Sequence, residues 1–125
     1  MKCFYIIYLF LFNFIFFLNQ INVCIDIVFI AVPHQPVPTT CIFVPQNSTA
    51  YDAMLVSANL PCHNFTYTIF PEKGVFIDSL CHVENDKDKH YDWFFYVNHV
   101  MCGMGVSKYE IQPNDNLTFI YRLSR

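Results

Sequence analysis

Three patterns of apolar and polar positions divide the chain. Residues 3–18 are almost continuously apolar and are interrupted only by Asn13. From Asn64 to Phe70 apolar and polar residues alternate, which is the period of a half-buried β-strand. Residues 50–58 instead combine small and apolar side chains at helical spacing. The pattern therefore predicts an apolar leader followed by a domain of short strands and one helix.

The leader has the layout of a secretory signal peptide. It starts with a positive charge at Lys2, its apolar run is short for a membrane span, and polar residues follow at Asn19, Gln20 and Asn22. We expect a signal peptide at residues 1–24 with cleavage after Cys24, while cleavage after Gln20 or Asn22 stays open. An uncleaved signal anchor is the alternative, which those polar residues disfavour. Residues 25–125 would form one small domain.

Seven segments rich in branched and aromatic residues, bounded by turn residues, predict β-strands at 25–32, 41–45, 64–70, 75–80, 93–98, 107–111 and 117–123. Between the second and third, Thr49 fits a helix N-cap and Asp52 completes a capping box. Pro61 would end that helix. This order of elements predicts an α+β, β-grasp-like domain in which one helix packs on a mostly antiparallel sheet of about five short strands.

The cysteines indicate an oxidising compartment. Cys3 lies in the leader and Cys24 at the expected cut, which leaves an even set at Cys41, Cys62, Cys81 and Cys102. We expect two disulfides. The helix is nearly as long as the 41–45 strand, so a helix that runs back along this strand would bring Cys62 close to Cys41. This geometry favours Cys41–Cys62 and leaves Cys81–Cys102. The second pair fits a hairpin poorly, so the pairing stays open.

Three Asn-X-Ser/Thr sequons lie in the expected mature chain, and they are predicted glycosylation sites at Asn47, Asn64 and Asn116. Together with the leader and the paired cysteines, they predict a secreted, extracellular protein. No membrane association is expected after signal cleavage.

Charge and motif content exclude several function classes. The net charge is −3 and no basic stripe occurs, so we expect no nucleic-acid partner. We expect no metal site and no cofactor, because the five histidines lie at scattered positions without zinc-ligand spacing. No nucleophile elbow, phosphate loop or HExxH motif is present, so we expect no enzyme. A Cys102–His99 dyad is the alternative, and a bridged Cys102 disfavours it.

The aromatic strand leaves two interpretations open. Alternation places Trp93, Phe95 and Val97 on one face and Phe94, Tyr96 and Asn98 on the other. Either the core and a neighbouring loop cover both faces, or one face is an apolar platform for a ligand or a partner.

Four segments in order resemble the C-terminal β domain of transcobalamin and intrinsic factor, over roughly residues 25–125. The first is the polar entry into a helix of small residues, "VPQNSTAYDAMLVSA". The others are "NFTYTIFPEKGVFIDSL", "NDKDKHYDWFFYVN" and "GMGVSKYEIQPNDNLTFIYR", with their aromatic strands and glycines. His99 stands where many relatives have glycine, and Asn114-Asp115 replaces the usual glycine-aspartate turn. The sequence shows no counterpart of the helical-barrel domain that completes the ligand site in full-length carriers, so we expect a small single-domain member.

The resemblance implies ligand contacts from the tryptophan strand and the flanking glycine loops, which here are Trp93, Phe95, Val97, Asn98, Gly103, Gly105, Gly74, Val75 and Phe76. It implies a secreted, non-enzymatic binding protein whose candidate ligand is cobalamin, another corrinoid or another small apolar molecule. A second protein chain could replace the helical barrel. The alternative is a secreted protein–protein interaction module with no small-molecule ligand.

Overall fold

The structure, a computed structural model, describes residues 19–125, so residues 1–18 of the signal peptide predicted at 1–24 lie outside the described residues. Within that range the chain forms strands and one short helix, in the order β1 (Gln20–Phe29), β2 (Thr40–Pro45), α2 (Ala50–Ser57), β3 (Phe65–Phe70), β4 (Gly74–Leu80), β5 (Val83–Glu84), β6 (Tyr91–Val97), β7 (Val100–Met101) and β8 (Asp115–Leu123).

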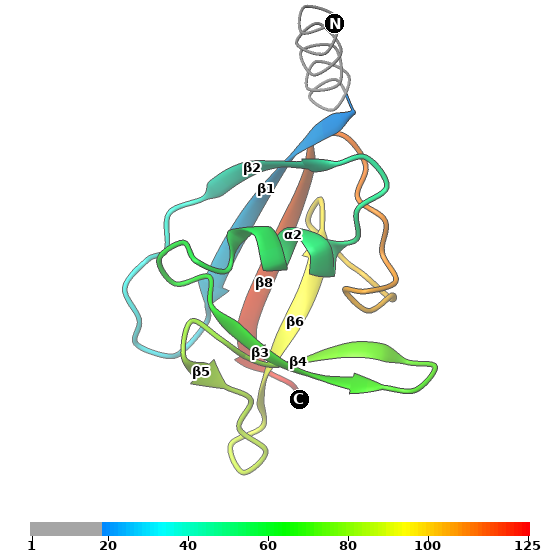
Figure 1. Ribbon diagram of the computed structural model, residues 1–125. Coiled ribbons are helices and arrows are strands. Elements are labelled where there is room, and N and C mark those ends of the chain that lie inside the picture. Colours follow the sequence, from blue (N-terminus) through cyan, green and yellow to red (C-terminus); the bar gives the residue numbers. More distant parts are fainter. Residues whose placement is uncertain (1–18) are drawn as a thin grey trace, which may run out of the picture.

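The larger sheet has five strands in the order β2-β1-β8-β6-β7 (Figure 1). The central pair, β1 and β8, is parallel, whereas β1 with β2 and β6 with β8 are antiparallel. Along β1 the buried residues are Val23, Ile25 and Ile27, so alternate side chains face the core. The core of this domain therefore lies on one face of the larger sheet.

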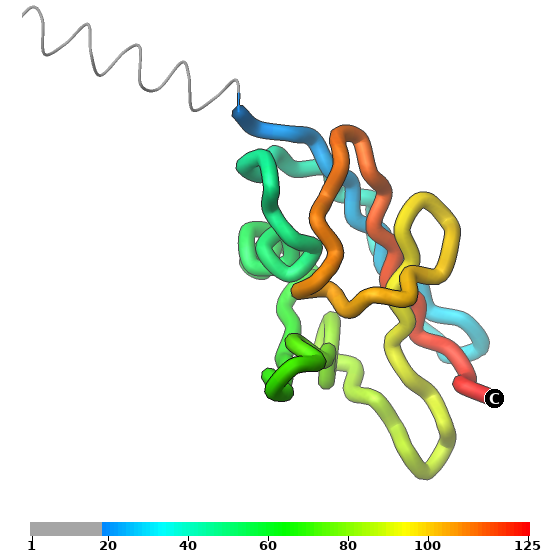
Figure 2. The backbone as a smooth tube through the Cα atoms, turned by 90° about the vertical axis from the view of Figure 1, so that its right-hand side faces the viewer, coloured from blue at the N-terminus to red at the C-terminus, as the bar shows by residue number. Residues whose placement is uncertain are grey.

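Helix α2 and the smaller sheet, β3-β4-β5, lie on the same side of the larger sheet (Figure 2). Ala50, Ala53 and Met54 bring α2 into the core. The predicted capping box is confirmed: the Asp52 amide donates to Thr49 Oγ1 at 3.1 Å, and the Thr49 amide donates to the Asp52 carboxylate at 2.9 Å.

Residues 103–112 pass beside the start of α2 without forming a strand. The Ala50 amide donates to the Tyr109 carbonyl at 3.0 Å, and the Tyr51 amide donates to the Val106 carbonyl at 2.9 Å. The strand predicted at 107–111 is therefore wrong, because these carbonyls serve the first turn of the helix; one isolated bridge joins Glu110 to Thr49.

The predicted α+β, β-grasp-like class is also wrong. The described residues form two sheets rather than one, and helix α2 has only eight residues. Strands β4 and β6 do not form a hairpin, since β4 pairs with β3 and β5 while β6 pairs with β7 and β8. Residues 19–125 form a sheet-rich fold with one short helix.

The disulfides differ from the expected pairing, Cys41–Cys62 and Cys81–Cys102. Cys24 bonds to Cys41, and Cys62 bonds to Cys81. Cys24 is the direct antiparallel partner of Cys41 in the register of β1 and β2, which places their Cα atoms 4.0 Å apart. Cys102 is free and half-buried. Cys24 lies in β1, which already begins at Gln20, and not in the leader as expected, so it is available to pair with Cys41.

Among residues 19–125, no helix has the length and apolar character needed to cross a bilayer.

Candidate functional site

The turn between β3 and β4 borders an open cleft of about 490 Å³, here called the hairpin cleft. Its lining residues come from β3, β4, the turn between them and two further loops, and they are Phe70, Lys73, Gly74, Val75, Phe76, Lys87 and Gly105. A second cavity of about 530 Å³ shares Phe70, Phe76 and Lys87 with it and continues toward carboxylates at Asp78, Glu84 and Asp92. The two cavities thus form one surface, apolar at one end and acidic at the other.

Gly74 lets the 105–107 loop lie against the hairpin. Gly74 has φ +85°, and the space where its Cβ would lie is occupied by the Ser107 hydroxyl. The Val75 amide donates to that hydroxyl oxygen at 3.0 Å. Gly105 approaches the Val75 carbonyl, which lies 3.7 Å from where its Cβ would be. The wall of the hairpin cleft is therefore held by the hydrogen bond to Ser107 and by the close approach of its hydroxyl to Gly74.

The hairpin cleft exposes an aromatic pair beside two ammonium groups. Phe70 and Phe76 are 45% and 51% exposed, and their rings meet edge to face with centroids 6.3 Å apart. Lys73 and Lys87 line the same cleft. Such a lining can hold a flat apolar group by ring contact and a carboxylate, phosphate or carbonyl oxygen by the lysines.

The structure brings together four of the nine residues expected to contact a ligand: Gly74, Val75, Phe76 and Gly105 line the hairpin cleft. The tryptophan strand does not join them. Trp93, Phe95 and Val97 pack against the core instead.

Specific contacts hold this strand inward. The indole N–H of Trp93 donates to the Val83 carbonyl at 2.7 Å, and the Phe95 ring stacks on Phe119 at 5.3 Å between centroids. The outer face of the same strand is partly covered, because the Arg122 guanidinium lies 3.9 Å above the Phe94 ring and donates to the Tyr96 hydroxyl at 3.1 Å. The strand is therefore structural on its inner face.

The two remaining expected residues lie elsewhere. Asn98 has φ 51° and donates through its side-chain amide to Asp115 at 2.9 Å, while its side-chain oxygen accepts from the Asn116 amide at 2.8 Å. It fastens the end of β6 to the start of β8. Gly103 faces open space and lines no cavity described above.

Asp115 is a buried carboxylate that organises the loop before β8. It accepts from Asn98, from the Tyr109 hydroxyl and from the Gln112 amide at 2.8 Å. Burial first, and then the hydrogen bond to Asp115, raise the pKa of Tyr109 to about 12. These contacts are structural support and lie outside the hairpin cleft.

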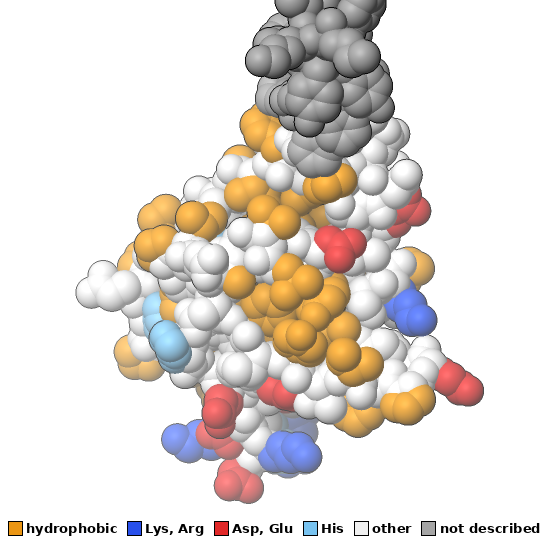
Figure 3. Space-filling view, viewed as in Figure 1, with side chains coloured by type: hydrophobic (Ala, Val, Ile, Leu, Met, Phe, Trp, Pro, Cys, Tyr) orange, Lys and Arg blue, Asp and Glu red, His pale blue; other side chains and the backbone are white. Residues whose placement is uncertain are grey.

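An exposed apolar surface lies over α2 and β3, here called the helix–hairpin patch, and Figure 3 shows apolar side chains gathered on that face. Its exposed members are Leu55, Val56, Tyr67 and Ile69, of which Ile69 is 67% exposed. Beside them the Tyr51 and Tyr67 rings meet edge to face at 5.1 Å, and the Tyr67 hydrogen bond raises the pKa of Tyr51 to about 12. Contiguous apolar surface of this kind is typical of interaction sites.

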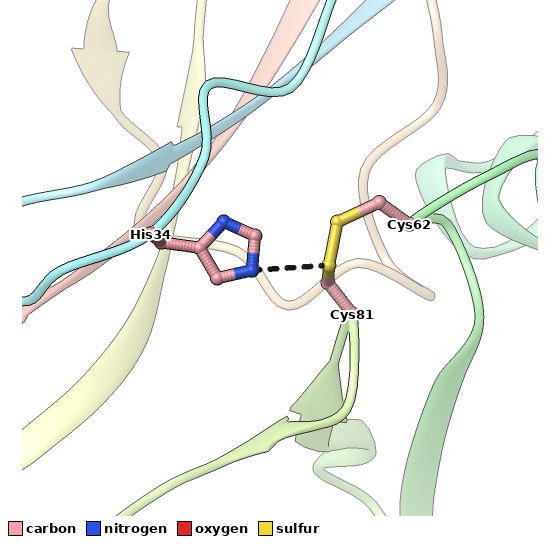
Figure 4. Close-up of side chains that lie close together, drawn as sticks. All are labelled: His34, Cys62 and Cys81. Atoms are coloured by element: carbon pink, nitrogen blue, oxygen red, sulfur yellow. Dashed lines mark hydrogen bonds between the residues drawn. A yellow bond between two sulfur atoms is a disulfide. The ribbon is translucent and has the colours of Figure 1, made fainter.

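Sequence reasoning missed a third cluster, formed by His34, Cys62 and Cys81 (Figure 4). The His34 Nε2 lies 3.6 Å from the Cys81 Sγ, and the imidazole stacks on the Phe29 ring at 3.8 Å. The three residues come from three separate segments, so no spacing in the sequence could reveal them. The expectation of no metal site rested on such spacing alone.

Comparison with known proteins identifies the fold. A sequence model of the family described as "Domain of unknown function (DUF4430)" matches residues 47–122. No curated protein matches the chain by sequence. Among solved structures, haptocorrin in complex with Cbi superposes with a TM-score of 0.71 at 15% identity, over 82% of this chain and 25% of that chain. A candidate metal-binding protein from Ruminococcus gnavus ATCC 29149 superposes with a TM-score of 0.61 at 11% identity, over 84% of this chain and 99% of that chain.

The chain therefore spans about a quarter of the haptocorrin chain that it matches. At these identities the likeness establishes a shared, transcobalamin-like fold. The resemblance inferred from the four sequence segments is confirmed at that level, although the β-grasp description of the domain is not.

Proposed function

This protein belongs to the DUF4430 family, and on that premise we propose that it is a secreted, non-enzymatic binding protein that holds a small ligand in the hairpin cleft. The observation that carries the proposal is the exposed Phe70–Phe76 pair beside Lys73 and Lys87 in a cavity of about 490 Å³. That volume is in the range of small-molecule sites. Both structural neighbours described above are binding proteins, which supports a binding role.

A flat ligand with polar substituents suits this cleft best. The haptocorrin neighbour holds a corrinoid, so we propose a corrinoid, cobalamin or cobinamide, as the ligand class to test first. The cleft is open on one side, so this domain contacts only part of a ligand of that size. Tight binding would then need a second protein chain that covers the open side of the cleft, so that this domain forms one half of the binding site.

Equilibrium dialysis with dicyanocobinamide tests the proposal. Phe76→Ala is expected to weaken binding by about tenfold, because it removes one ring of the exposed pair. Phe43→Ala is the matched control: Phe43 is also in a strand and is 59% exposed, but it does not line the cleft. Equal loss in both variants, or no retention of cobinamide by the native protein at millimolar concentration, would refute the corrinoid version.

Secretion belongs to the same proposal. Two disulfides are typical of extracellular proteins. Cleavage after Cys24 would remove half of the Cys24–Cys41 bond, so we place the cut after Gln20, which keeps that cysteine in the mature chain. N-terminal sequencing of the secreted protein is expected to start at Ile21. An intact Met1 would contradict cleavage.

The helix–hairpin patch favours a second function, that of a protein-interaction module. Leu55 and Val56 on α2 and Ile69 on β3 are all about half or more exposed, and none of the three lines the hairpin cleft. Replacement of Val56 and Ile69 by Ser should leave cobinamide binding unchanged if the hairpin cleft is the functional site. If the patch binds a protein, the immobilised variant should lose a partner that the immobilised native protein retains.

A further inference from the structure

The His34–Cys62–Cys81 cluster has the composition of a zinc site in its reduced form. Two cysteines and a histidine are a common zinc ligand set. Their candidate ligand atoms all lie within 4.8 Å of one another. Cys81 is buried, Cys62 is half-buried and His34 is exposed, so the cluster has a protected base and one side open to solvent.

The spacing of nitrogen and sulfur agrees with tetrahedral coordination. With Zn–S near 2.3 Å and Zn–N near 2.0–2.1 Å, two ligand atoms of one tetrahedron stand about 3.6 Å apart. The His34 Nε2 and the Cys81 Sγ are 3.6 Å apart. The Cα atoms of Cys62 and Cys81 are 4.3 Å apart, so a rotation of one side chain brings the two sulfurs to a ligand–ligand distance once their bond is broken.

The imidazole is already oriented for this role. Its Nδ1 lies 2.7 Å from the Gln35 carbonyl, which can only accept a hydrogen bond, so Nδ1 carries the proton. The Nε2 lone pair is then free and faces the sulfur (Figure 4). A histidine whose second nitrogen donates to a carbonyl is the usual arrangement of a metal ligand. Stacking on Phe29 at 3.8 Å fixes the plane of the ring.

We propose that reduction of the Cys62–Cys81 disulfide turns this cluster into a site for one Zn²⁺ ion, ligated by Cys62, Cys81 and His34 Nε2. A dithiol or phosphine reductant supplies two electrons, the S–S bond breaks, and two protons convert the sulfurs to thiols. Zn²⁺ then binds both sulfurs as thiolates and displaces those two protons to solvent. A water fills the fourth position. Disulfide and metal are mutually exclusive states of one site, and this role is separate from ligand binding in the hairpin cleft.

Cobalt(II) is the probe, because thiolate coordination gives it visible and near-ultraviolet absorbance. The protein is the mature chain with Cys102→Ser, which removes the free thiol, reduced with a phosphine under nitrogen. One Co²⁺ per chain is expected, displaced by one Zn²⁺, and the oxidised protein is expected to bind none. The His34→Ala variant should lose at least about tenfold in affinity, which is the lower end of the loss caused by outer-sphere mutations alone, and its cobalt spectrum should shift.

Two double variants separate this site from the other cysteine pair. Cys62→Ser with Cys81→Ser is expected to abolish the cobalt absorbance, whereas Cys24→Ser with Cys41→Ser is expected to keep it. If reduction loosens the fold, added Zn²⁺ should restore the near-ultraviolet circular dichroism signal of the reduced Cys102→Ser protein. It should not restore that signal in the same protein carrying His34→Ala. Unchanged cobalt binding by the Cys62/Cys81 variant, or an unchanged spectrum and affinity in His34→Ala, would overturn the proposal.

Discussion

The Val75 amide donates a hydrogen bond to the Ser107 hydroxyl oxygen at 3.0 Å, and so joins the β3–β4 hairpin to a loop 32 residues later in the chain. This contact closes one wall of the hairpin cleft. It can form only because Gly74, the residue before, carries no side chain where that hydroxyl lies.

Replacement of Gly74 by alanine is therefore expected to destabilise the protein by about 2 kcal/mol or more. The positive φ of +85° costs an alanine roughly 1–2 kcal/mol, and the new Cβ must displace Ser107. Urea denaturation followed by circular dichroism measures the change. Gly103→Ala is the control, because a Cβ there meets nothing within 4 Å, and its stability should stay within about 0.5 kcal/mol of the native value. An equal loss in both variants would contradict the role of the Ser107 contact.

Asp115 should be more important to stability than any exposed carboxylate of the chain. It is 4% exposed and accepts from Asn98, Tyr109 and Gln112. We expect Asp115→Asn to cost about 1.5–3 kcal/mol, because an amide group presents a donor where the native site needs an acceptor. Asp88→Asn, at an exposed loop position, is the control and should be near neutral by thermal denaturation.

Alkaline pH should weaken the fold through Tyr109. Its pKa is raised from 10.0 to about 12, first by burial and then by its hydrogen bond to Asp115. The folded state thus holds the phenol proton more tightly than the unfolded state does. The resulting stabilisation is fully present below pH 10 and is lost as the pH rises through about 12. Urea midpoints measured from pH 9 to 12 should fall less steeply in Tyr109→Phe, and an identical slope in both proteins would rule out this group.

Loss of the Cys24–Cys41 disulfide should reduce the stability of the protein far more than loss of the free thiol of Cys102. Loss of the Cys24–Cys41 bond in Cys24→Ser is expected to cost about 2–4 kcal/mol, because it releases the edge strand β2 from β1. Cys102→Ser removes a free thiol and should change stability little. Alkylation without reduction, followed by peptide mass mapping, should label Cys102 within residues 19–125 and recover the pairs Cys24–Cys41 and Cys62–Cys81. Labelled Cys24 in the folded protein would contradict the pairing.

Glycan occupancy should differ between the sequons at Asn47 and Asn116. Asn47 is exposed in a loop before α2. Asn116 lies in the central strand β8, where its amide nitrogen donates to Asp26 at 2.8 Å and its oxygen accepts from Thr118 at 2.7 Å. A glycan on that nitrogen would break the contact with Asp26. Mass mapping after enzymatic deglycosylation is expected to find Asn47 modified and Asn116 unmodified, and the reverse result would contradict this reading.

Local signals in the sequence predicted most elements of the fold correctly. The Thr49–Asp52 capping box depends only on neighbouring residues and is present in the structure. The alternation at residues 64–70 correctly predicted strand β3, but not its half-buried character, because Thr66 to Phe70 are all exposed. The strand expected at 107–111 failed because its carbonyls serve α2, which is a contact between distant segments. The single-sheet arrangement failed for a similar reason, since strand propensity does not say which strands pair.

The candidate site could be predicted only in part. Glycine at Gly74 and Gly105 marked the loops of the hairpin cleft, and the structure brings them together. Trp93, the only tryptophan, was expected to contact a ligand, but its indole N–H donates a hydrogen bond to the Val83 carbonyl within the fold. Phe70 and the lysines of the cleft carried no signal of their own, because exposed aromatic residues and scattered charges are common in loops and edge strands.

The parallel pairing of β1 with β8 also sets the order in which the sheet can be assembled during synthesis. Val23 lies opposite Asp115, so β1 must wait for β8, which is synthesised much later, before the larger sheet can close. Until then β2 is the only strand beside β1 in the larger sheet. The Cys24–Cys41 link holds that hairpin together through the delay, and it shields one side of an apolar strand from pairing with other nascent chains.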